Sequence, residues 1–234
     1  PLESKPGFRV EYSCLGFVLL AEAIRRQSGL TLASYCERSI FKPLNMRSTL
    51  FNPPSKLRHR IAPTEEGNAF ERSMAGDSGD QYPNWRVHRL HGEVHDGNAW
   101  FAGGEGGNAG LFSTAEDLTR FCRCMLNGGS FDKTRILSRE TVEFATRNHT
   151  AALNLHRGLG WQMASTTRTA GSRLSLRAYG HTGFTGTSIW IDPEFDLAIV
   201  FLTNRIWYGG AGDAFGRFRG ALHDTIMESI TEKS

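Results

Sequence analysis

The side chains best suited to chemistry lie in residues 180–186, which read GHTGFTG and lead into an apolar run. His181 can hold or release a proton near neutral pH. Gly183 and Gly186 let a substrate or another backbone approach a strand closely. We therefore expect this run to form one edge of an active site, although a histidine that merely caps a strand is the plain structural alternative.

Far upstream, Tyr12 is followed by Ser13 and Cys14. The plain structural interpretation of Tyr12 is a half-buried tyrosine whose hydroxyl finds an ordinary partner. Cys14 is not expected to be a nucleophile, because no histidine at suitable spacing accompanies it and buried thiols are usually inert.

Helical periodicity dominates the first part of the chain. Apolar residues repeat at helical spacing over residues 15–24, and Gly29 is placed as a C-terminal cap. A second helix is expected over residues 31–41, which Pro43 ends. Ser113 with Glu116 predicts a capping box that opens a third helix. Ser138 is expected to open a fourth.

In the second part of the chain the helical spacing of apolar residues gives way to a strand pattern. Residues 158–163, 177–181, 187–192 and 197–203 are short runs rich in β-branched and aromatic side chains, which predicts strands. A hairpin turn is expected at residues 192–196 and a final helix over residues 211–230. The fold class is therefore α+β, with an antiparallel sheet flanked by a C-terminal helix.

Two regions of one domain are expected on this pattern. Residues 1–150 would form a mainly helical subdomain with long cleft-lining loops, and residues 151–234 the antiparallel sheet with its C-terminal helix. Residues 52–110 show little periodicity, and so long an irregular stretch is more often functional than decorative.

Composition excludes several classes of function. The 234 residues carry a net charge of only +3 without a basic stripe, so nucleic acid is not an expected partner. No apolar run is long enough to span a bilayer. The four cysteines lack metal-type spacing and are expected to be reduced thiols. The chain begins without a methionine or signal pattern, so a segment is expected upstream and localisation is left open.

Five segments in this order resemble the serine β-lactamase and penicillin-binding-protein superfamily, in particular its class C-like branch of esterase-like serine hydrolases. The resemblance covers nearly the whole chain and implies a β-lactamase/transpeptidase-like fold whose N-terminal part is missing here. The segments are residues 6–14, 19–29, 40–46 and 109–118, and residues 181–183 with 192–193.

The resemblance implies acyl transfer through a serine ester, with Tyr12 helping to move the serine proton and to protonate the leaving group. His181 occupies the first position of a Lys-Thr-Gly-like element, where it would act electrostatically. Thr182 would offer its hydroxyl to substrate. Phe184 would place its backbone N–H in the oxyanion hole, with Gly183 keeping the strand edge open.

Cys14 departs from the family pattern, which usually has asparagine there. A thiol is a weak donor and a weak acceptor, so recognition of a substrate amide at this position is in doubt.

The family nucleophile is a serine three residues before a lysine at a helix start. Ser39 with Lys42 and Ser130 with Lys133 have this spacing. Ser39 would lie late in a helix and Ser130 in a loop, so both are rejected. The nucleophile is expected upstream of residue 1, and this chain alone is expected to be inactive. The same absence predicts an exposed apolar face where the missing elements would pack.

Three histidines, His88, His91 and His95, raise the rival interpretation of a metal site. The favoured alternative is that residues 91–110 line the substrate cleft, with Trp100 in a hydrophobic wall. No metal and no cofactor is therefore expected.

We expect a serine hydrolase that acts through an acyl-enzyme on a small-molecule or peptide substrate, namely a β-lactam, a carboxylic ester or a D-amino-acid peptide. The alternative is a catalytically inactive ligand-binding or peptidoglycan-sensing relative of the same fold, which the replacement at Cys14 would fit. Fold alone does not separate these.

Overall fold

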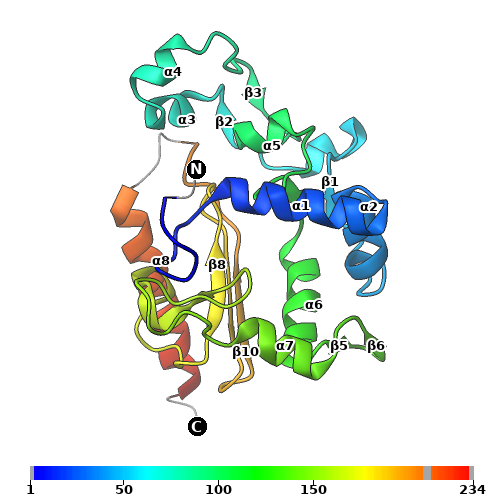
Figure 1. Ribbon diagram of the computed structural model, residues 1–234, viewed down its shortest axis with the longest axis vertical. Coiled ribbons are helices and arrows are strands. Elements are labelled where there is room, and N and C mark those ends of the chain that lie inside the picture. Colours follow the sequence, from blue (N-terminus) through cyan, green and yellow to red (C-terminus); the bar gives the residue numbers. More distant parts are fainter. Residues whose placement is uncertain (1–2, 208–211, 232–234) are drawn as a thin grey trace. The chain divides into compact units, whose positions relative to one another are not determined.

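The computed structural model describes residues 3–207 and 212–231 (Figure 1). The chain forms two compact units. The sheet unit comprises Pro1–Tyr12, Leu118–Thr203 and Gly212–Ser234, and the helical unit comprises Ser13–Asp117 and Asn204–Ala211. Tyr12 and His181 therefore belong to the same unit.

The sheet unit is built on a four-stranded antiparallel sheet with the strand order β10-β9-β8-β7. The four predicted strands and the hairpin between β9 and β10 are confirmed, with shorter strands than expected. The final helix is also confirmed, although its expected start at residue 211 lies outside the described residues. The elements are β7 (Gln162–Met163), β8 (Tyr179–Thr182), β9 (Ser188–Asp192), β10 (Leu197–Phe201) and α8 (Gly212–Thr231).

The remaining elements of this unit connect or cover the sheet. They are the helix α6 (Ala115–Leu126), whose first three residues belong to the helical unit, the hairpin β5 (Ser130–Phe131) with β6 (Thr134–Arg135), the helix α7 (Arg139–Thr146), and the 3₁₀ turns η3 (Ala164–Thr166) and η4 (Arg168–Ala170). Ser138 caps α7 as predicted, because its hydroxyl accepts from the Thr141 N–H. The cap of α6 differs: the Asp117 N–H bonds to the hydroxyl of Thr114, one residue later than the expected Ser113.

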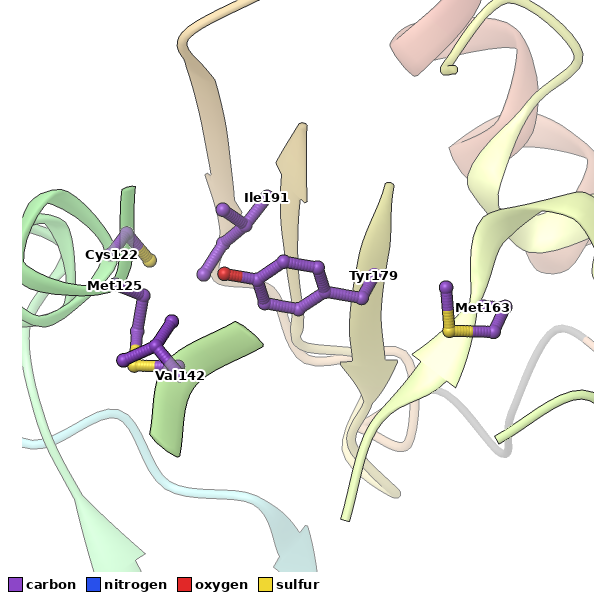
Figure 2. Packing of buried hydrophobic residues seen from close by; sticks show 6 residues of the cluster. All are labelled: Cys122, Met125, Val142, Met163, Tyr179 and Ile191. Carbon is purple, nitrogen blue, oxygen red and sulfur yellow. The ribbon is translucent and has the colours of Figure 1, made fainter. Parts of the chain in front are cut away.

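The middle strand β9 is covered on both faces, and its side chains alternate between two cores. Ile191 packs with Tyr179 against residues of α6 and α7, such as Cys122 and Val142 (Figure 2). Trp190, one residue earlier, packs on the other face, where α8 contributes Ile226. Because successive strand residues point to opposite faces, this alternation fixes which residues share a face. His181 pairs with Ile189 and Tyr179 with Ile191, so His181 lies on the α6 and α7 face.

The hydrophobic core around Ile191 also explains two unreactive polar groups. Burial raises the pKa of the Cys122 thiol to about 12. Burial, with a smaller contribution from Cys122, also raises the pKa of Tyr179. Both groups therefore stay neutral and act as packing residues. For Cys122 this agrees with the reduced, buried thiol expected from the sequence.

The helical unit begins with α1 (Cys14–Ser28), which ends as predicted at Gly29 with a left-handed φ of 69°. The expected helix over residues 31–41 is present but continues as a π-helix in its second half. The remaining elements are α2 (Leu32–Cys36), the π-helix η1 (Glu37–Phe41), β1 (Leu50–Phe51), η2 (Ser55–Arg60), β2 (Glu65–Glu66), α3 (Ala69–Met74), α4 (Asp77–Gln81), β3 (Arg89–Leu90), α5 (Gly97–Phe101) and β4 (Leu111–Phe112).

An exposed apolar face lies along α1, none of whose residues is buried. Leu15 and Leu19, one helical turn apart, are 68% and 69% exposed, and Leu20 is 58% exposed. An exposed apolar face is thus present, as expected from the sequence. None of the helices in the described residues combines the length and the apolar character needed to cross a bilayer.

A buried polar network organises the irregular part of the helical unit. The Arg86 guanidinium donates to the Asn68 side chain at 2.7 Å and to the carbonyls of Val94 and His95. The His95 imidazole lies 3.0 Å from a carboxylate oxygen of Glu65, with both side chains almost fully buried. Burial, and then the Arg86 cation, lower the pKa of His95 to about 4, whereas burial raises the pKa of Glu65.

Replacing Ile191 by alanine is predicted to lower the free energy of unfolding by about 2–5 kcal/mol, because it leaves a cavity at a fully buried position. The matched control is Leu176→Ala, which removes the same number of carbon atoms at an 81% exposed position and should change stability by less than about 0.5 kcal/mol. Denaturant unfolding measures both. Equal effects in the two variants would show that the sheet core is not where the structure places it.

The buried His95 predicts acid sensitivity. Its folded-state pKa of about 4 lies below the ordinary value of 6.5, so the unfolded chain binds one more proton between these two pH values. Stability is fully present above pH 6.5 and falls as the pH drops toward 4, with a slope of at most about 1.4 kcal/mol per pH unit from this group. The raised pKa of Glu65 has the opposite effect on stability as the pH falls. The contribution of His95 is therefore measured as the difference in slope between the parent and a variant.

The comparison is between the parent protein and His95→Gln, with the exposed His59→Gln as control. Urea unfolding from pH 7 to pH 4 should show a shallower decline in His95→Gln and an unchanged decline in His59→Gln. A parent-like decline in His95→Gln would rule out a desolvated His95.

Candidate active site

The two residues proposed to do chemistry, Tyr12 and His181, meet in the sheet unit. Their rings stack with centroids 6.2 Å apart and planes inclined by 26°. They are separated by 169 residues of sequence (181 minus 12). Tyr12 is 63% exposed and His181 is half-buried, so the pair has one side on the protein surface and one side on the sheet.

The protonation state of His181 follows from its surroundings. Its Nδ1 lies 2.8 Å from the Thr182 carbonyl oxygen, which can only accept, so Nδ1 carries a proton. Burial lowers the pKa of His181, the hydrogen bond to Thr182 opposes this, and the Arg157 cation lowers the pKa further. Neutral His181 therefore presents Nε2 as an acceptor, and the expected donation from His181 requires its protonated form.

Residues 183–187, which follow Thr182, form a tight turn between β8 and β9. The Gly183 N–H donates to the Thr187 carbonyl at 2.7 Å, and the Gly186 N–H donates to the Gly183 carbonyl at 3.0 Å. A Cβ on Gly183 would collide with the Thr187 hydroxyl, so a larger residue at this position would require the Thr187 side chain to move. Thr182 ends β8 opposite Ser188, and Phe184 follows on the turn, both half-buried. The backbone of this segment is thereby fixed directly beside His181.

Two predicted site residues, Cys14 and Trp100, belong to the helical unit. Cys14 is the first residue of α1, next to the cap Ser13, whose hydroxyl accepts from the Gly16 N–H at 3.2 Å. Trp100 lies in α5, where the Arg86 guanidinium stands 5.2 Å from the ring centroid. Phe101 packs edge-on against Trp100. Their roles toward a substrate stay predictions.

The two Ser-x-x-Lys matches lack the setting of a nucleophile. Ser39 lies inside the π-helix η1, and Lys42 after it pairs with Glu37 at 2.9 Å on the surface. Ser130 lies in β5, and Lys133 occupies the hairpin turn with a left-handed φ of 68°. Neither serine stands at the start of a helix with its lysine one turn further on.

The three histidines considered for metal binding have separate partners. His88 lies 2.5 Å from a Glu93 oxygen, His91 lies 2.8 Å from the Ile61 carbonyl, and His95 faces Glu65. Across the described ranges of the chain, no three His, Cys, Asp or Glu side chains are grouped as a metal ion would require. The donor set therefore does not fit a metal centre.

A hollow of about 610 Å³ lies in the helical unit. Its lining includes Asn68, Arg72, Asp77 and Trp85, and none of the site residues predicted from the sequence. The Arg72 guanidinium pairs there with Asp80 at 2.9 Å. The hollow thus adds no group to the Tyr12 and His181 pair.

One residue that sequence reasoning did not single out acts on both rings. Burial lowers the pKa of Arg157, and the charge of Tyr12 raises it. Arg157 in turn lowers the pKa of His181. No local signal marks Arg157, because its partners lie 145 positions upstream (157 minus 12) and 24 positions downstream (181 minus 157) in the chain.

Comparisons with known proteins show to which family the chain belongs. A putative D-alanyl-D-alanine carboxypeptidase of Salmonella typhi is 39% identical over 212 residues, which are 88% of this chain and 47% of the relative. The chain thus spans about half the length of the curated relatives it matches.

Solved structures agree on the fold. A β-lactamase of Mycobacterium bovis aligns with a TM-score of 0.67 at 23% identity, covering 97% of this chain and 67% of that one. A family VIII carboxylesterase aligns with a TM-score of 0.58 at 17% identity, covering 94% of this chain and 60% of that one. The expected β-lactamase/transpeptidase-like α+β fold is therefore confirmed. The model of the family described as Beta-lactamase matches residues 1–213, and the chain belongs to the β-lactamase family.

Proposed function

We propose that this chain supplies one wall of the acyl-transfer site of a serine hydrolase, whose attacking serine and its lysine lie upstream of residue 1. The observation that supports this most is the stack of Tyr12 on His181 at 6.2 Å. A proton-transferring phenol and an imidazole, brought together from opposite ends of the chain, are the groups that such a site needs beside the nucleophile.

Tyr12 would take the proton of the attacking serine and return it to the leaving group. Neutral His181 offers Nε2 as an acceptor for a hydroxyl proton, while its Nδ1–H stays on the Thr182 carbonyl. Once protonated, His181 would instead donate to a phenolate or to a substrate carboxylate. His181 would therefore accept a hydrogen bond when it is neutral and donate one when it is protonated.

The turn after His181 would receive the substrate carbonyl. The Phe184 N–H is proposed as an oxyanion donor and the Thr182 hydroxyl as a substrate ligand. A fixed donor stabilises the developing oxyanion without reorganisation at the moment of reaction. The hydrogen bonds of Gly183 and Gly186 hold this turn, which supports such a role.

The substrate is proposed to be an acyl compound with a scissile ester, amide or peptide bond. A peptide ending in D-alanine is the first to test, because a relative at 39% identity is named a putative D-alanyl-D-alanine carboxypeptidase. Lactams and carboxylic esters come next, since proteins named for those activities share the fold.

A second candidate function rests on Cys14. A thiol there cannot both donate and accept strongly, as the family asparagine does, which favours a relative that binds such ligands without turning them over. The absence of a covalent adduct, together with reversible binding of the same ligand, would favour this second candidate over the hydrolase.

We expect a fluorophosphonate probe to label one serine of the full-length protein, at a position upstream of residue 1. Tyr12→Phe should slow labelling by about 10²–10⁴-fold, the usual contribution of a general acid–base group. Tyr35→Phe, on α2, is the matched control and should label at the parent rate. Mass spectrometry locates the adduct. Labelling of Ser39 or Ser130, or an unaffected Tyr12→Phe variant, would contradict the proposal.

The purified chain on its own should not hydrolyse an activated ester, because the nucleophile is absent and little beyond binding remains. The measurement is release of nitrophenol from a nitrophenyl ester by chain whose folded state has been verified by circular dichroism. Tyr12→Phe corrects for surface hydrolysis. Steady turnover by the parent chain that disappears in Tyr12→Phe would show that the nucleophile lies within residues 1–234 after all.

A further inference from the structure

The segment between α7 and β7 reaches both halves of the Tyr12 and His181 pair. Its Asn154 clamps the backbone two residues before Tyr12. The Asn154 side-chain oxygen accepts from the Val10 N–H at 2.9 Å, and its amide nitrogen donates to the Val10 carbonyl at 3.1 Å. A side-chain amide thus replaces the backbone partner that a neighbouring strand would supply.

The same segment is tied to the strand that carries His181. Arg157 forms a β-bridge with Gln162, and Gln162 pairs with Gly180, the neighbour of His181. The backbone of Arg157 is fixed on both sides. Its N–H donates to the Thr150 hydroxyl at 2.8 Å, and its carbonyl accepts from the His149 N–H at 2.8 Å.

The charge of Arg157 is the third feature of this segment. Arg157 is half-buried, and within residues 3–207 and 212–231 no carboxylate pairs with it. The nearest acidic candidate in sequence to Tyr12, Glu11, pairs instead with Arg9 at 2.6 Å. An unpaired, half-buried cation is costly unless a negative group compensates it. A phenolate at Tyr12 would provide that compensation, since its charge favours the charged form of Arg157.

We propose that Arg157 is a positioning residue of the Tyr12 and His181 site, whose cation stabilises negative charge on the Tyr12 oxygen and keeps His181 neutral. Asn154 and the bridge to Gln162 tie the backbone around Arg157 to the two segments that carry the rings. The interaction is reciprocal, because two charges that attract each other each favour the charged form of the other. The catalytic consequence rests on the function proposed above, but the electrostatic interaction does not.

The test measures ionisation directly and needs no turnover. Ultraviolet titration of the full-length protein, minus that of Tyr12→Phe, isolates the phenolate signal of Tyr12. In Arg157→Met the midpoint should move upward by about 1–3 pH units, the usual effect of losing a nearby opposite charge. In Arg157→Lys it should stay close to the parent value.

Nuclear magnetic resonance of the His181 ring gives a second readout. The pKa of His181 should rise in Arg157→Met, because a cation that lowers it is gone. The matched control is Arg177→Met, an exposed arginine of the same unit. It should leave both titrations unchanged. Circular dichroism verifies that each variant is folded.

Unchanged midpoints in folded Arg157→Met, or equal shifts in Arg177→Met, would overturn the inference. If Arg157→Met does not fold, Arg157→Lys and Asn154→Ala replace it. Asn154→Ala frees the Tyr12 backbone and should also raise the Tyr12 midpoint, and no rise would count against the inference. A shift without serine labelling would uphold the role of Arg157 and reject the proposed function. Serine labelling without a shift of the Tyr12 midpoint would uphold the proposed function and reject the role of Arg157.

Discussion

The double-sided burial of β9 is the constraint on which the sheet unit depends. Trp190 packs toward α8, and Ile189 and Ile191 pack toward α6 and α7. Because the side-chain period of a strand is two, a slip of one residue would bury the wrong face of every paired strand. The register of β8 against β9 is therefore strongly specified. That register sets His181 opposite Ile189 and on the same face of the sheet as Tyr179.

The charges of His181, Arg157 and Tyr12 influence one another at the edge of this sheet. Burial and the charge of Arg157 both favour the neutral form of His181, and the hydrogen bond to Thr182 opposes them. The same cation is half-buried and gains from a negative Tyr12. A positive imidazole beside Arg157 would repel it, whereas a phenolate would attract it. Burial and the Arg157 cation therefore both disfavour positive charge on the imidazole.

Much of the fold could be predicted from local patterns. Period-two runs identified all four strands of the large sheet, and caps such as Gly29 and Ser138 lie where the sequence placed them. Thr114 displaced Ser113 as the cap of α6, and adjacent hydroxyl residues give no local basis for that choice. His181 could be found from its residue type and its glycine neighbours, Tyr12 only through the resemblance to a family, and the structure brings the two rings together.

Arg157 and Asn154 could not be found in that way. Their chemistry is common to any surface arginine or asparagine, and their meaning comes from partners far along the chain, such as Val10 at a separation of 144 residues. The Arg86 network was missed for a related reason. Its acceptors are mainly backbone carbonyls of an irregular segment, which no side-chain pattern announces.

The boundary between the two units falls between Tyr12 and Ser13, so Tyr12 belongs with β8 and not with α1, although α1 follows it directly in sequence. The Asn154 clamp on Val10 supplies the physical basis for this membership. The position of the phenol against His181 is consequently set by contacts within the sheet unit. The 6.2 Å between the two ring centroids is therefore a property of the sheet unit itself.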